Sequence, residues 1–267
     1  MEGNSGMTSL SSVAPGQRVA IAFETNGKGW HGFLVLPPGA YVRGPTRKEA
    51  PSKTDLEVRT FLRWAGVRTR VTKYRGYPVE EHRSTLQVED ADNEILLSAD
   101  ARPLDGAELD VYLALARRSA SSFQRLWDTV EFPDWVDARR VRRTFWGDNP
   151  ATVRDVYGHV LRTQHWYLSR LGLGATQAST DLVSSRERCL QAMAGAWKRG
   201  VGSEGREADG ELWTLRKVLR RLVWHDRIHA KAAARILARQ KIEGLIGAYE
   251  DPFGFQAAPV RLSTSRT

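Results

Sequence analysis

Apolar and polar residues alternate along the first third of the chain, in the pattern of short β-strands. Residues 18–24 (RVAIAFE) predict a strand, residues 26–29 (NGKG) a turn, and residues 30–36 (WHGFLVL) a returning strand. Pro37-Pro38-Gly39 ends the second strand. The full set of predicted strands is 18–24, 30–36, 40–44, 85–90 and 94–99.

A single helix is predicted among these strands. Thr46 and Glu49 have the spacing of a capping box, and the segment TDLEVRTFLRWAG continues the helix to a stop at Gly66. Its predicted apolar positions are Leu56, Phe61, Leu62 and Trp64.

From residue 107 onward the apolar residues recur every three or four positions, as they do in amphipathic helices. The second of these helices is expected to start near Pro150 with Asn149 as its cap, and residues 200–210 are expected to be a loop. The predicted helices span about 106–130, 150–171, 181–198 and 211–240. The fold class is therefore α+β, with a small N-terminal α/β lobe followed by a four-helix bundle.

The same patterns predict the domain boundaries. The polar stretch ADARPLDGAE contains proline and glycine, which is typical of a connection between domains, so a fragment of residues 104–267 is expected to stay helical. The predicted parts are a disordered leader at 1–17, the lobe at 18–103, the bundle at 104–250 and an irregular tail at 251–267.

The composition is that of a folded globular protein, with 41% hydrophobic and 27% charged residues. Cys189 is the single cysteine, so an internal disulfide and a thiolate metal cluster are excluded, and we expect a small buried side chain there. No apolar run approaches the ~20 residues of a membrane span. The leader lacks the basic and apolar regions of a signal peptide. We expect a cytoplasmic protein with no membrane partner.

The net charge of +9 falls mostly after residue 106. A basic domain raises the question of nucleic-acid binding. No zinc finger, RNA-binding aromatic signature or recognisable helix-turn-helix accompanies the charge, so a nucleic-acid partner is not our expectation. A solvated basic face, or a site for an anionic small molecule near the mouth of the bundle, explains it instead. The densest basic run is Arg139, Arg140, Arg142 and Arg143.

Three histidines lie on two of the predicted helices. His225 and His229 form an H-x-x-x-H pair, which places two imidazoles on one helical face, and His159 lies on the apolar side of another helix. Three imidazoles from adjacent helices can hold one divalent metal and leave a coordination position open, as catalytic sites do. Imidazole ligands favour zinc, nickel or iron. His165 is six residues beyond His159 and is expected at the surface or rim.

Residues 18–66 resemble the HicB-like fold of antitoxin proteins. The resemblance comes from a strand, a G-x-G turn, an aromatic strand, the stretch LPPGAYVRGPT and a helix, although Pro51 departs from the pattern. Such antitoxins usually append a DNA-binding segment and pair with a small toxin, and no such segment is visible here. The resemblance implies a lobe with a structural or substrate-shaping role.

The segments TVRDVYGHVLRTQHWYLSRLG and LVWHDRIHAKAAARIL resemble the second and fourth helices of the DinB/YfiT-like superfamily of four-helix metalloproteins. The resemblance covers most of residues 107–245. It implies that His159, His225 and His229 bind a divalent metal. It also implies thiol-dependent chemistry, such as transfer of bacillithiol, mycothiol or glutathione, or isomerisation of maleylpyruvate.

These observations favour an enzyme in which a metal activates a low-molecular-weight thiol against a small electrophilic substrate. Asp226 is expected either to orient a ligand histidine or to form a surface ion pair with Arg221 or Arg227. Two alternatives stay open: a metal-dependent hydrolase, and a non-catalytic stress-response or toxin-neutralising protein whose metal is structural. A homodimer is compatible with either. The predicted substrate- and thiol-binding residues are Arg162, Arg170, Arg227 and Trp166.

Overall fold

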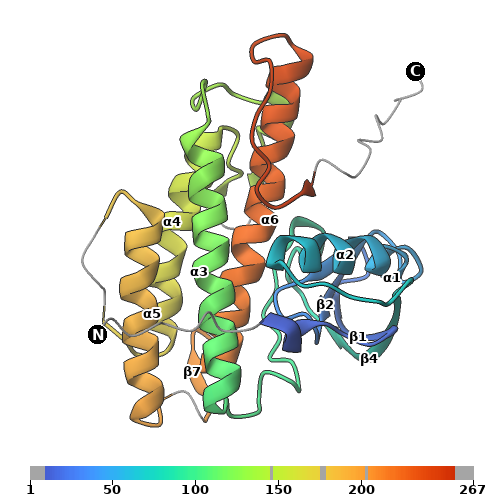
Figure 1. Cartoon of the computed structure of the whole chain (residues 1–267), viewed down its shortest axis with the longest axis vertical. Helices are drawn as coiled ribbons and strands as arrows, with labels where there is room; N and C mark the ends of the chain where they lie inside the picture. The colour runs from blue at the N-terminus through green and yellow to red at the C-terminus, as the bar shows by residue number, and fades with distance from the viewer. Residues whose placement is uncertain (1–9, 145–146, 175–178, 202–203, 256–267) are drawn as a thin grey trace.

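The structure is a computed structural model that describes residues 10–144, 147–174, 179–201 and 204–255. It is a mixed α/β arrangement in which a sheet lobe lies against one side of four long helices (Figure 1). Residues 1–9 of the predicted leader and 256–267 of the predicted tail lie outside the described residues. The prediction of a disordered leader is wrong for residues 10–17, because Leu10–Val13 form a 3-10 helix and Val13 is buried.

The lobe is built on a four-stranded sheet in the order β3-β2-β1-β4. Strands β1 (Arg18–Thr25), β2 (Trp30–Leu34) and β3 (Tyr41–Gly44) are antiparallel neighbours and confirm the predicted meander. The fourth strand, β4 (Arg75–Arg83), pairs in parallel with β1.

Strand β4 was not predicted, and the strands predicted at 85–90 and 94–99 are wrong. Val88–Asp90 form a 3-10 helix, and residues 94–99 have no regular structure. The sequence of β4, RGYPVEEHR, hides the strand because it lies at the sheet edge and is largely exposed. An edge strand tolerates Pro78 and charged side chains that a central strand would exclude.

Helices α1 (Glu49–Ser52) and α2 (Thr54–Ala65) cover the sheet. Thr46 Oγ1 accepts a hydrogen bond from the Glu49 amide at 3.1 Å, which is one of the two bonds of a capping box. The predicted capping box is incomplete, because α1 starts after Lys48 and the Glu49 side chain accepts from Lys53 instead. Gly66 ends α2 in the left-handed conformation, with φ 73°, which glycine adopts at little cost. Leu56 is 49% exposed, so its assignment to the apolar face is wrong and Val58 occupies that place instead.

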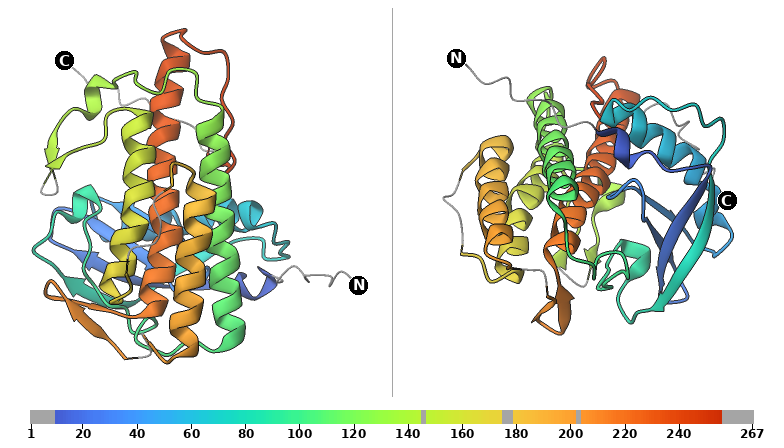
Figure 2. Two further views of the ribbon diagram at one scale, coloured as in Figure 1. Left: turned by 90° about the vertical axis from the view of Figure 1, so that its left-hand side faces the viewer. Right: turned by 60° about the horizontal axis from the view of Figure 1, so that its bottom comes forward.

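Two of the four long helices confirm the predicted boundaries. Helix α3 (Gly106–Asp128) starts at a capping box between Asp105 and Glu108, and α5 (Leu182–Lys198) is capped by Asp181. Helix α3 contacts α5 and α6, and α4 contacts the same two helices, so the four lie side by side (Figure 2). We call α3–α6 the helical unit.

The other two helices start later than predicted. Helix α4 (Val153–Arg170) is capped by Thr152, whose side chain accepts from the Asp155 amide in a reciprocal capping box. The prediction of Asn149 as cap is wrong, since Asn149 belongs to the preceding connection, where its side-chain amide donates to the Arg140 carbonyl. Helix α6 (Leu215–Ile242) is capped by Thr214.

A small hairpin replaces the predicted start of the last helix. Strands β7 (Arg206–Ala208) and β8 (Glu211–Trp213) pair across Asp209 and Gly210, both of which have positive φ. The Asp-Gly pair is a strong hairpin signal. Another small hairpin, β5 (Arg143–Thr144) with β6 (Gly147–Asp148), lies in the connection between α3 and α4, after the 3-10 helix Ala138–Arg140.

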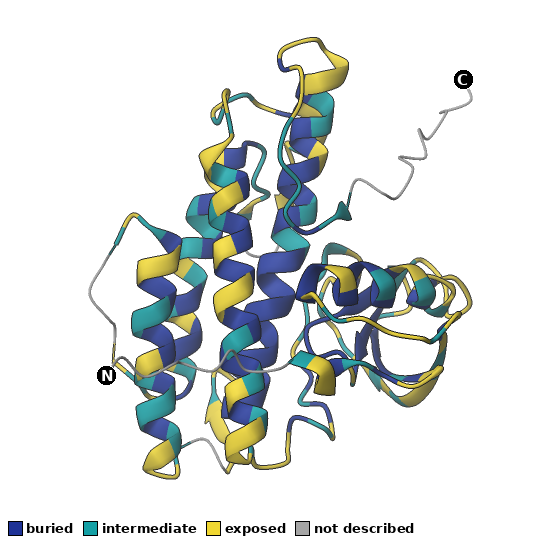
Figure 3. Ribbon diagram, in the orientation of Figure 1, coloured by how far each residue is buried: buried dark blue, intermediate teal, exposed yellow. Residues whose placement is uncertain are grey.

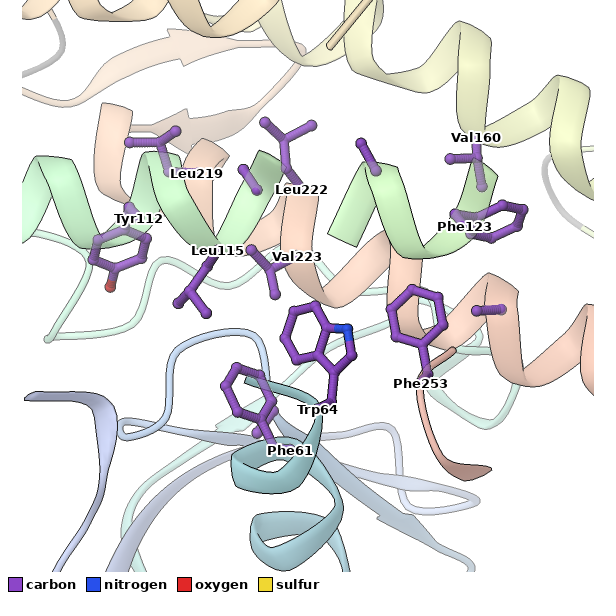
Figure 4. Packing of buried hydrophobic residues seen from close by; sticks show 14 of the residues in the cluster. Phe61, Trp64, Tyr112, Leu115, Phe123, Val160, Leu219, Leu222, Val223 and Phe253 are labelled. Atoms are coloured by element: carbon purple, nitrogen blue, oxygen red, sulfur yellow. The ribbon is translucent and has the colours of Figure 1, made fainter. Parts of the chain in front are cut away.

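The lobe and the helical unit are joined by continuous apolar packing. Phe61 and Trp64 of α2 pack beside Leu115 and Val223, and Trp64 stacks on Phe253 at 5.5 Å between ring centroids (Figure 4). Helix α6 is buried along most of its length because it lies between the lobe and the other helices (Figure 3). The predicted domain boundary near residue 104 thus crosses one hydrophobic cluster.

Candidate metal centre

Helices α4 and α6 bring the three predicted histidines together. The Nε2 atoms of His159 and His225 are 3.0 Å apart, and the ring of His229 lies 4.5 Å from His159 and 4.3 Å from His225 between centroids. The pair on α6 shares a face because four residues make slightly more than one turn. His159 joins them from the edge of the buried face of α4, so residues 66 positions apart in the chain meet in one cluster.

The spacing of the nitrogens fits a divalent metal. One ligand atom from each histidine lies within 4.8 Å of the others. In a tetrahedral zinc site with Zn–N bonds of 2.0–2.1 Å, two ligand atoms are about 3.3 Å apart. Among the described residues this group contains three histidines and neither a cysteine nor a carboxylate. The donor set is therefore three imidazoles, which leaves a tetrahedral ion one position open.

The three imidazoles are held neutral. Burial lowers the pKa of His159 to about 4, with a smaller contribution from the positive charge of Arg162. Burial also lowers the pKa of His225 and His229 well below the usual value, and the neighbouring histidines add to the effect. Neutral imidazole is the form that binds a metal, so protons compete weakly with metal at this cluster.

Asp226 lies directly after His225 but faces away from the three histidines. Its Oδ2 accepts from Ser119 Oγ at 2.5 Å and from Arg186 at 2.8 Å, and its Oδ1 accepts from Arg186 at 3.0 Å. Both charged side chains are fully buried. The predicted surface ion pair with Arg221 or Arg227 is wrong. Asp226 instead fixes α6 to α3 and α5 immediately beside a ligand residue.

The buried Arg186 was not singled out in the sequence, because a lone arginine within a predicted helix usually faces solvent. Its Nε donates to Gln164 Oε1 at 2.9 Å, and Gln164 lies on α4 between the turns that carry His159 and Leu168. Arg186 therefore ties α4 to α6 from behind the histidine cluster. The sequence gives little sign of this network. Periodicity alone does not tell whether a polar residue such as Arg186 lies on the buried or the exposed side of its helix.

Aromatic side chains form one wall beside the cluster. Tyr167 of α4 is buried and packs edge-on against His225, with 5.9 Å between centroids. Burial raises the pKa of Tyr167 to about 12, so its hydroxyl stays protonated. Trp213 of the hairpin contacts both Tyr167 and Trp166. Trp166 is itself 38% exposed and lies at the rim.

Two of the four predicted substrate-binding residues, Arg170 and Trp166, are brought together, and the other two lie elsewhere. Arg162 is exposed on α4, and its charge acts on His159. Arg170 lies over the Trp166 ring and pairs with Asp209. Arg227 is fully buried on the opposite side of α6 and pairs with Glu57 of the lobe at 2.7 Å. The expectation that Arg227 binds a thiol is wrong, because no solvent reaches its guanidinium.

The remaining histidines and the cysteine lie outside the cluster. His31 is fully buried in the lobe, where its Nε2 accepts from Trp224 Nε1 at 3.1 Å. His165 is partly buried, with its Nε2 3.1 Å from Ser185 Oγ, and His82 lies beside Glu80 at the sheet edge. Cys189 is buried, as expected.

No family model, no curated protein and no solved structure matches this chain. The described helices include none long and apolar enough to cross a membrane.

Proposed function

We propose that this chain is a divalent-metal-dependent enzyme of the DinB-like type, with His159, His225 and His229 as the metal ligands. The observation that supports this proposal is the meeting of three neutral imidazoles from α4 and α6 with no carboxylate or cysteine in the group. A structural zinc site usually closes with a fourth protein ligand, so three ligands favour catalysis. Zinc, nickel and iron suit this donor set.

The reaction we propose is the transfer or isomerisation of a small electrophilic substrate with a low-molecular-weight thiol as co-substrate. A divalent metal in such a site supplies a low thiol pKa, which makes the thiolate available at neutral pH. Arg162 is the predicted thiol-binding cation that remains exposed near His159, and it can hold a carboxylate of the thiol. Tyr167 and Trp213 shield the histidines from water on one side.

Metal-dependent hydrolysis is the alternative within enzymes. Hydrolytic sites commonly pair the metal with a carboxylate general base. The carboxylate nearest to the cluster in sequence, Asp226, is fully occupied by Ser119 and Arg186 and is 0% exposed. This arrangement favours thiol chemistry over hydrolysis.

Metal content is the first test. Elemental analysis of the purified chain should give about one divalent ion per chain, and His225→Ala should lose it, because two imidazoles bind such an ion far more weakly. His165→Ala is the matched control, since it removes an imidazole from the same helix as His159 but outside the cluster. Equal metal content in wild type and His225→Ala would exclude the site.

The thiol is the second test. In the cobalt-substituted chain, a thiolate charge-transfer band should appear in the near ultraviolet when glutathione, mycothiol or bacillithiol is added. Arg162→Ala should keep the metal and weaken thiol binding about tenfold, the scale of one charge-assisted hydrogen bond. Arg154→Ala, another exposed arginine on α4 that pairs with Asp134, is the control. If none of the three thiols changes the spectrum, hydrolysis or a structural metal moves ahead.

A further inference from the structure

Four arginines from three separate parts of the chain lie where the lobe meets α6 and the connection between α3 and α4. Arg43 lies on β3 of the lobe, Arg140 and Arg142 lie in the connection between α3 and α4, and Arg235 lies on α6. We infer that these four residues form a binding site for an oxyanion, the carboxylate or phosphate group of a small molecule.

The packing of β3 against α6 places Arg43 and Arg235 near each other. Lys231 Nζ lies over the Tyr41 ring at 4.3 Å, and Gly39 lies against Val223, so residues 39–43 run in the same direction as α6. Two residues along a strand cover about 6.7 Å and four residues along a helix about 6 Å. Arg43 and Arg235 are therefore the next pair beyond Tyr41 and Lys231, on the same side of each element.

The connection between α3 and α4 brings the other two arginines to the same place. Arg142 donates to Asp90 Oδ2 of the lobe at 2.5 Å, and Arg140 Nε donates to the Pro150 carbonyl at 2.8 Å. Gln240 of α6 donates to the Phe132 carbonyl at 2.9 Å, which attaches the connection to the end of α6. Figure 2 shows this connection beside α4 and α6, at the end away from the β7–β8 hairpin.

The positive charges in this group are incompletely neutralised. Arg142 pairs with Asp90, whereas the ion pairs among the described residues include none for Arg43, Arg140 or Arg235. The Arg43 guanidinium donates to a backbone carbonyl, that of Glu89, at 2.5 Å. Burial lowers the pKa of Arg43 and of Arg140, and the charge of Arg235 lowers both further.

Acidic groups around these four arginines offset only part of their positive charge. Asp90 faces Arg43 and Arg142, Asp137 faces Arg140, and Asp92 faces Arg142. Asp90 is already committed to Arg142, and Asp137 accepts a backbone hydrogen bond from Arg139 as the cap of its 3-10 helix. Enclosed guanidinium groups that repel one another are costly unless an anion binds between them.

A small anion fits this site better than a nucleic acid does. Arginine binds carboxylates and phosphates through its planar fork of donors, often two bonds at a time. Arg43 and Arg140 are partly enclosed at the junction of lobe and helices rather than spread over an exposed face. A nucleic-acid backbone needs a row of exposed cations, and two of these four arginines, Arg43 and Arg140, are not exposed.

The test is calorimetric titration of the full chain with inorganic phosphate and with succinate, both with its metal and after chelation. At least one of the two anions should bind, and Arg235→Ala should weaken that binding about tenfold, because the variant removes one charge-assisted partner from an exposed position without a packing role. Arg143→Ala is the matched control and should change the affinity less than about twofold, since this exposed arginine belongs to the same basic run but acts on neither Arg43 nor Arg140.

Phosphate binding without succinate binding would identify a phosphate-bearing ligand, and the reverse a carboxylate. Binding that persists after chelation and depends on Arg235 supports the anion site even if the metal proposal fails. Absence of binding by both anions at millimolar concentration overturns the inference while leaving the metal centre intact. An equal loss in Arg143→Ala, or tight binding of a DNA oligonucleotide that phosphate does not displace, also overturns it in favour of a general basic surface.

Discussion

Two polar faces of helix α6, one toward the lobe and one toward α4, differ in whether their polar groups have partners of opposite charge. Toward the lobe, Arg220 pairs with Asp100 at 2.6 Å, and Glu57 receives both Arg227 at 2.7 Å and Lys231 at 2.9 Å. Toward α4, the three histidines meet one another, and among the described residues their group includes no carboxylate. Pairing of buried charges is what a structural contact requires, because one unpaired partner is strongly destabilising.

The difference between the two faces indicates where function lies on this helix. Neutral imidazoles gathered without a counter-charge contribute little to stability and are suited to binding a cation. In the sequence the two faces look the same, since each consists of polar residues within an amphipathic helix. The residues that lie opposite each face make the difference. Partners of opposite charge indicate a contact that joins two parts of the chain, and their absence indicates a site that can bind a ligand.

Removing the lobe should have the largest effect on stability, because it removes the acidic partners of the lobe-facing side of α6. A fragment of residues 104–267 deprives Arg227 and Lys231 of Glu57, and Arg220 of Asp100. We expect it to lose cooperative unfolding, since two buried arginines, the half-buried Lys231 and the surface that contacted Phe61 and Trp64 become exposed together. Circular dichroism during heating is the measurement. A fragment that unfolds as sharply as the full chain and keeps its metal would show instead that the boundary near residue 104 separates independent units.

A single carboxylate tests the lobe-facing side more precisely. Glu57→Gln leaves Arg227 buried without a counter-charge and should lower the free energy of unfolding by ~3–5 kcal/mol. Glu49→Gln, which removes the exposed pair with Lys53, should cost less than ~1 kcal/mol. His229→Ala in the metal-free chain should also cost only ~1 kcal/mol, because no charged partner is lost. Urea denaturation of the three variants measures the loss of free energy of unfolding in each. Equal losses in Glu57→Gln and Glu49→Gln would contradict the prediction.

Lowering the pH should reduce the stability that Glu57 contributes on the lobe-facing side, by less than the substitution Glu57→Gln does. The pKa of Glu57 is lowered by Lys231 and Arg227, which outweigh the opposing effect of burial. A carboxyl group with a lowered folded pKa adds stability above its unfolded value of 4.5, and that stability is lost as the pH falls through the folded pKa. Between pH 5 and 3 the metal-free wild type should therefore lose more stability than Glu57→Gln does. Parallel pH profiles for the two proteins would show that Glu57 does not titrate in this range.

Local patterns determined much of this protein. The alternation in residues 18–44 specified three strands, and the capping residues Asp105 and Asp181 specified the starts of α3 and α5. The H-x-x-x-H spacing specified that His225 and His229 share a face. These features depend on residues within one or two turns of each other, so the sequence alone contains the necessary information.

The tertiary structure decided whatever depends on a distant partner. Strand β4 exists because β1 offers it an edge, and Asp226 turns inward because Arg186 of α5 meets it there. Arg227 likewise faces Glu57, 170 residues away, rather than a substrate. A charged side chain has the same helical position whether it is solvated, paired or functional. Its role is set by the desolvation and counter-charge that the folded chain brings to it, which local sequence does not contain.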